Sequence, residues 1–179
     1  VTGTAPVTGK FVLDTSEGAN SQLDVSSELK GIDLELPSPF GKIADEVRPM
    51  NLSFIIGAES DQRQTLKLAY DEHVNLAIQL REGELFGGQI YLGKTEAYVP
   101  NDPGLVIQGH VDRIDAKKWL TVWEQIEAQD ALYAKRAPAN SASPNKPREK
   151  QKQATKQTDE VPIREIIIST DVLVYEEHR

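Results

Sequence analysis

Cysteine is absent from this chain of 179 residues, which also contains only one methionine and two tryptophans. Without cysteine there can be no disulfide, no thiolate nucleophile and no zinc–thiolate site. No apolar run approaches the roughly 18 residues that a membrane-spanning helix requires. These absences exclude thiol chemistry for the chain and give no sign of a spanning helix within it.

Positive charge is also scarce. Twenty Lys and Arg residues face 28 Asp and Glu residues, and the formal net charge is -8. A nucleic-acid partner requires a basic surface that neutralises phosphates. We therefore expect no nucleic-acid partner.

The two ends of the chain suggest a piece of a longer protein. It begins at Val1 rather than at Met, and it stops shortly after the alternating apolar residues 172–175. Natural chains rarely end directly after such a strand, so we expect the parent protein to continue beyond both ends.

Period-two alternation of apolar and polar residues is the dominant pattern, and it is typical of β-strands with one buried face. Turn residues separate the alternating runs, for example Glu82-Gly83 and Pro103-Gly104. The pattern predicts a mainly β fold: a curved antiparallel sheet, groove-like or sandwich-like, in which neighbouring strands follow each other along the chain. The predicted strands are residues 23–29, 32–36, 50–56, 66–70, 74–80, 86–92 and 105–111.

One amphipathic helix of about five turns is predicted near residues 115–134. Asp115 is a suitable N-cap. Trp119, Trp123 and Ile126 follow at helical spacing and form an apolar stripe. We expect this stripe to pack against the sheet or to cap one end of it.

The composition divides the chain into three parts. Residues 1–136 form the β-sheet segment with its helix. Residues 137–160 contain three prolines and no Leu, Ile, Phe, Trp or Tyr, so they cannot bury enough apolar area to offset the entropy of ordering them. We predict that they are a disordered polar linker. Residues 161–179 return to alternation and predict a further strand, cut short by the chain end.

Residues with catalytic or metal-binding chemistry are few. None of the three histidines has the spacing of a common metal motif. His110 and Asp112 could form a ligand pair on one strand face, but we interpret both as surface polar residues. Gly87-Gly88 lies within a predicted strand, where glycine marks a bend, a bulge or a close backbone approach rather than a phosphate loop. We predict no catalytic residue, no metal site, no cofactor and no enzymatic activity. An envelope hydrolase stays open as a rival, and it would require a concave polar site.

The apolar strand faces admit two interpretations. They are a closed core, covered by a second layer, or an open surface filled by acyl chains, and alternation alone does not separate the two. If the surface is open, the lipid-facing candidates are Leu66, Leu68, Val74, Leu76, Ile78, Leu80, Ile90, Leu92, Leu105 and Ile107.

Three stretches of the sequence resemble the large AsmA-like envelope proteins of the YhdP type. In residues 27–42, a Leu-Lys-Gly turn is followed by a strand that ends in Leu-Pro-Ser-Pro and then Gly-Lys. Residues 85–93 resemble the glycine-rich strand of that family. Residues 104–111, followed by Ile114-Asp115 and Trp119, resemble its strand that leads into a tryptophan-bearing helix.

This resemblance implies a periplasmic part of a protein anchored in the inner membrane of a Gram-negative bacterium. Members of the family are thought to form long β-sheet grooves with apolar interiors. The implied function is phospholipid transport between the inner and outer membranes and maintenance of the outer-membrane barrier, with phospholipid as the partner. The alternative is a closed structural or protein-interaction module without lipid contact.

Overall fold

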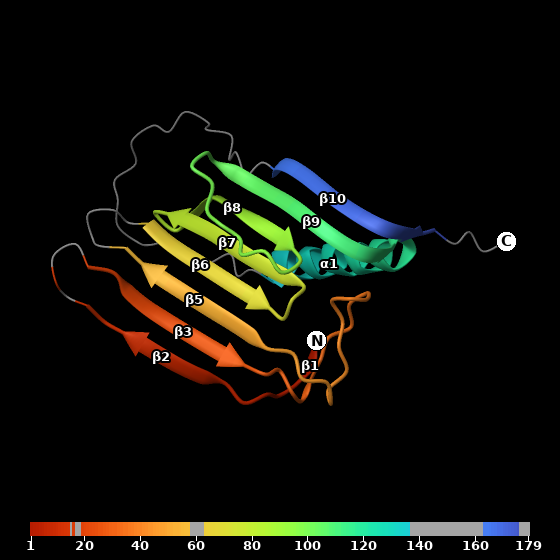
Figure 1. Cartoon of the computed structure of the whole chain (residues 1–179), viewed down its shortest axis with the longest axis horizontal. Helices are drawn as coiled ribbons and strands as arrows, with labels where there is room; N and C mark the ends of the chain where they lie inside the picture. The colour runs from red at the N-terminus through yellow and green to blue at the C-terminus, as the bar shows by residue number, and fades with distance from the viewer. Residues whose placement is uncertain (15, 17–18, 58–62, 137–162, 176–179) are drawn as a thin grey trace.

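An eight-stranded β-sheet forms the body of the molecule (Figure 1). The computed structural model describes residues 1–14, 16, 19–57, 63–136 and 163–175, with side chains of the helix only as far as residue 126. The predicted linker 137–160 lies outside the described residues, as do residues 161–162 and 176–179.

The sheet runs in the order β10-β9-β8-β7-β6-β5-β3-β2, and β1 and β4 form a separate two-stranded sheet. The helix α1 spans Ala116–Arg136. The strands are β1 Thr2–Gly3, β2 Thr8–Val12, β3 Ser21–Ser27, β4 Ile32–Asp33, β5 Met50–Ile56, β6 Arg63–Tyr70, β7 Val74–Arg81, β8 Glu84–Leu92, β9 Gly104–Asp115 and β10 Ile163–Val174.

The strands from β2 to β8 pair antiparallel with their neighbours in the sheet. Leu68 of β6 lies opposite Leu52 of β5 and Leu76 of β7, and Leu76 lies opposite Ile90 of β8. Cross-strand partners project from the same face of a sheet. The alternation of the sequence therefore becomes one apolar and one largely polar face, and the prediction of a mainly β fold is confirmed.

The sheet is antiparallel, as predicted, from β2 to β8, but not at its other side. The pairs β8–β9 and β9–β10 are both parallel. A parallel pair requires a connection that returns the chain to the same end of the sheet. Residues 93–103 provide this connection between β8 and β9, so Pro103-Gly104 ends a crossover rather than a hairpin. The chain between β9 and β10 contains α1.

Residues 32–36 do not form one strand as predicted. Only Ile32–Asp33 is a strand, β4, and it pairs with β1. Leu34 forms an isolated bridge to Lys42, because the prolines at positions 37 and 39 turn the chain back on itself. Residues 28–49 therefore form an excursion between β3 and β5 rather than part of the large sheet.

The large sheet is open, with edges at β2 and β10. A sandwich would need a second sheet over the first. Within the described residues, the only other sheet is the small β1–β4 pair. The sandwich-like alternative is therefore not what the structure shows, and curvature of the sheet stays a prediction.

The connection of residues 93–103 covers part of the polar face. Beneath it, Gln89 is 1% exposed, and its side-chain oxygen accepts a hydrogen bond from the Tyr98 backbone N–H at 3.0 Å. Ala77 and Val106, which are paired in register with Gln89, are also buried, as is Ala97 of the connection. The best-covered part of the sheet is therefore not on its apolar face.

The turn of the β7–β8 hairpin contains a glutamate in the left-handed backbone conformation. Glu82 and Gly83 both have positive φ, 55° and 84°, as a two-residue type I′ turn requires. Since a left-handed conformation costs a residue with a Cβ roughly 1 kcal/mol and asparagine tolerates it better, Glu82→Asn should raise the free energy of unfolding by about 0.5–1 kcal/mol. Urea denaturation measures this change. Glu84→Asn removes the same charge from the neighbouring strand and should give no such gain; an equal gain from both variants would assign the effect to charge.

Candidate functional site

The apolar face of the large sheet is the first candidate site. All ten lipid-facing candidates are partly exposed, and none is fully buried. The buried hydrophobic residues of the described chain are Phe40, Ala77, Ala97, Val106 and Val111. Three of these, Ala77, Ala97 and Val106, belong to the opposite, polar face. The described residues therefore leave most of the apolar face without a covering layer.

A cavity of about 600 Å³ lies at one end of this face. The strands β6 to β9 form its floor, the excursion 28–49 forms one wall, and the start of α1 and the strand β10 complete it. Its lining is apolar except for Tyr70 and consists of Leu34, Leu36, Phe40, Leu68, Tyr70, Val74, Ile90, Leu92, Val111, Ile114, Trp119 and Ile168.

Four of the ten candidates line this cavity: Leu68, Val74, Ile90 and Leu92. The other six, Leu66, Leu76, Ile78, Leu80, Leu105 and Ile107, lie on the same face by strand register and continue it beyond the cavity. Sequence reasoning missed the wall residues of the excursion. The signal that marks them in the sequence is the Leu-Pro-Ser-Pro-Phe-Gly-Lys motif at residues 36–42.

Phe40 at the tip of the excursion fixes the wall against the rest of the site. Its ring lies edge-on to the Trp119 ring at 5.6 Å and to the His73 ring at 6.4 Å. The Tyr70 hydroxyl donates a hydrogen bond to the Phe40 carbonyl oxygen at 3.0 Å. Burial raises the pKa of Tyr70, so the phenol stays protonated and keeps its donor.

Lys42 holds the excursion together from inside. The residue is only 4% exposed. Its Nζ donates to the carbonyl oxygens of Leu29 and Ile43, both at 2.9 Å, and to that of Ile32. Among the described residues it forms no ion pair, so backbone carbonyl dipoles stabilise its charge. Lys42 is therefore a structural residue of the cavity wall.

The three residues of the predicted apolar stripe of the helix differ in their solvent exposure. Trp119 lines the cavity and contacts Phe40. Trp123 and Ile126 remain 62% and 49% exposed. Asp115 caps the helix, since its Oδ1 accepts a hydrogen bond from the Lys118 N–H at 3.1 Å. The helix thus places one aromatic ring at the cavity and leaves the rest of its stripe accessible.

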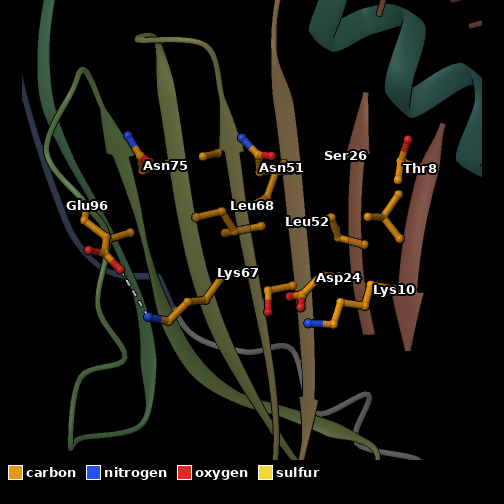
Figure 2. Close-up of a pocket in the computed structure, with 15 residues that line it drawn as sticks. Thr8, Lys10, Asp24, Ser26, Asn51, Leu52, Lys67, Leu68, Asn75 and Glu96 are labelled. Carbon is orange, nitrogen blue, oxygen red and sulfur yellow. Dashed lines mark hydrogen bonds and ion pairs between the residues drawn. The ribbon is translucent and has the colours of Figure 1, made fainter. Parts of the chain in front are cut away.

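A second cavity, of about 660 Å³, lies on the polar face between β2 and the 93–103 connection. Figure 2 shows its charged groups, Lys10 and Asp24 at one side and Lys67 paired with Glu96 at 3.2 Å. Hydrogen bonds from Gln22 and then Ser53 lower the pKa of Asp24. Asp24 accepts a hydrogen bond from Gln22 and Lys67 pairs with Glu96, and all four charged groups are exposed or partly exposed. The apolar face is therefore the stronger candidate site.

Comparison with known proteins gives one match. A family model described as YhdP protein matches residues 1–173. Comparison with curated proteins and with solved structures finds no match. Within the described part of the chain, no helix has both the length and the apolar character needed to cross a membrane.

Proposed function

Since this chain belongs to the YhdP protein family, a membership compatible with a role in the cell envelope, we propose that its sheet is one span of a periplasmic groove that carries phospholipid. In this proposal the parent protein is anchored in the inner membrane, moves phospholipid between the inner and outer membranes and so maintains the outer-membrane barrier. No step of this activity requires a cofactor within the chain.

The observation that carries the proposal is the uncovered apolar face. Ten Leu, Ile and Val side chains on the four adjacent strands β6 to β9 remain partly exposed. Exposed contiguous apolar surface on a water-soluble module marks a surface that binds something apolar. A strand of eight residues, such as β6 or β7, is roughly 27 Å long, which is close to the roughly 30 Å of a bilayer hydrocarbon core.

The chemistry of the cavity favours an acyl chain over a polar ligand. Among the described lining residues, the only hydroxyl belongs to Tyr70, and it already donates to the Phe40 carbonyl. Among the described residues, no charged side chain lines the cavity, so a headgroup has no charged partner there. An acyl chain would gain about 0.8 kcal/mol for each CH₂ group removed from water. We therefore place the acyl chain on the apolar face and the headgroup outside it.

Native mass spectrometry of the chain purified gently from bacterial cells tests the proposal. We expect co-purifying phospholipid and uptake of a phospholipid labelled on its acyl chain. The emission of an environment-sensitive label should shift to the blue, as in an apolar medium. An apo mass together with no uptake of added phospholipid would contradict the proposal and favour the alternative, a structural or protein-interaction module whose apolar face is covered by another part of the parent.

A further inference from the structure

A cluster of metal-ligating side chains lies away from the apolar site. His110 and Asp112 occupy neighbouring same-face positions of β9, and Asp171 lies on the adjacent parallel strand β10. One ligand atom from each residue lies within 4.8 Å of the others. The intervening Val111 and the nearby Ile168 line the apolar cavity, so the cluster faces away from that cavity.

One of the two ring nitrogens of His110, Nδ1, has a hydrogen-bond partner on β10. The Ser169 hydroxyl donates to the Gly109 carbonyl oxygen at 3.3 Å and lies 3.0 Å from His110 Nδ1. A hydroxyl has a single proton to donate, so when Ser169 donates to the Gly109 carbonyl it accepts from a protonated Nδ1. In neutral imidazole the lone pair is then on Nε2. A partner on Nδ1 that fixes the tautomer is typical of metal-bound histidine.

This free lone pair faces two carboxylates. Nε2 lies 3.5 Å from Asp112 Oδ1 and 3.6 Å from Asp171 Oδ2. These separations are too long for good hydrogen bonds. They match the roughly 3.4 Å between two ligand atoms that sit about 2.1 Å from one tetrahedral metal ion. Three acceptor atoms within 4.8 Å of one another repel unless a cation, or a proton on Nε2, lies between them.

We infer that His110, Asp112 and Asp171 bind a divalent transition-metal ion, of which Zn²⁺ is the best representative. One imidazole and two carboxylates suit Zn²⁺, Co²⁺ or Mn²⁺, whereas Mg²⁺ and Ca²⁺ prefer oxygen ligands alone. The side chains are 48%, 95% and 70% exposed, so water completes the coordination. The ion links β9 to the edge strand β10. This inference is independent of the proposed lipid function.

Isothermal titration calorimetry of the untagged chain with Zn²⁺ at pH 7.5 tests the inference. We expect one ion per chain and no comparable heat with Mg²⁺. His110→Ala should abolish binding, and Asp171→Asn should weaken it at least tenfold. Co²⁺ should give visible absorption bands that Asp171→Asn changes, because the ligand set differs. All three side chains are exposed, so their replacement should leave the fold intact, and circular dichroism checks that the variants are folded.

The chain contains a matched control. His73 Nε2 lies 3.6 Å from Asp71 Oδ2, a pair of the same kind without a second facing carboxylate in the same cluster. His73→Ala and His178→Ala should leave Zn²⁺ binding unchanged. Absence of Zn²⁺ binding by the unmodified chain would overturn the inference. Binding that survives His110→Ala, or that is lost with His73→Ala or His178→Ala, would overturn it as well.

Discussion

Leu68→Asp is expected to lower the phospholipid bound per chain at least tenfold. Leu68 lies at the centre of the apolar face, in register with Leu52 and Leu76, and it also lines the cavity. Removing a leucine contact costs an acyl chain about 1.5–3 kcal/mol, and each 1.4 kcal/mol is a factor of ten in affinity. A carboxylate next to the acyl chain adds a desolvation cost. Native mass spectrometry and the uptake of acyl-labelled phospholipid measure the loss.

Thr65→Asp on the same strand is the matched control. Thr65 belongs to the opposite face by alternation and is partly exposed like Leu68. It should retain lipid while it adds the same charge to β6. If both variants lose lipid equally, the effect comes from charge or from a damaged strand, and the apolar face is not the binding surface.

A second variant keeps the test independent of added charge. Ile90→Trp retains an apolar side chain but fills part of the cavity of about 600 Å³. It should reduce lipid uptake while circular dichroism and the melting temperature stay close to those of the unmodified chain. Unchanged uptake by a folded Ile90→Trp protein would place the lipid elsewhere on the sheet, or nowhere on it.

Alternation predicts most of the strands because each half-exposed strand carries its own period-two pattern. Residues 50–56 and 74–80 are examples, and the structure has β5 and β7 there. The direction of pairing is not a local property, however. Whether β9 lies parallel or antiparallel to β8 depends on the path of residues 93–103, which is held by Gln89 and by the bond from Asn75 Nδ2 to the Gly93 carbonyl oxygen.

The cavity is likewise predictable only in part, because one of its sides depends on contacts between residues distant in the sequence. Its floor consists of alternating strand residues such as Leu68 and Ile90, which a sequence pattern reveals. Its wall depends on a turn at Pro37–Pro39 that brings Phe40 to Trp119, far away in the chain. Likewise, His110 and Ser169 are 59 residues apart in sequence. Only the parallel β9–β10 register brings Asp171 to His110.

Lys42→Met is expected to lower the free energy of unfolding by about 2–4 kcal/mol, because three charge-assisted hydrogen bonds to backbone carbonyls are lost inside the excursion. This is a large fraction of the 5–15 kcal/mol that is typical of a domain. Methionine keeps the approximate volume of the lysine side chain, so the loss reports the ammonium group rather than a void. Urea denaturation monitored by tryptophan fluorescence measures the change, since Trp119 contacts Phe40 of the same excursion.

Lys30→Met provides the control, because Lys30 is exposed within the same excursion and its replacement removes the same charge. Its effect should stay within about 0.5 kcal/mol, as is usual for a surface substitution. Because Leu34, Leu36 and Phe40 line the cavity, Lys42→Met should also weaken uptake of acyl-labelled phospholipid under conditions where the sheet remains folded. A Lys42→Met protein as stable as the unmodified chain would show that the three hydrogen bonds of Lys42 do not hold the cavity wall. Reduced stability with normal uptake would mean that the lipid lies along the open part of the sheet, away from the wall.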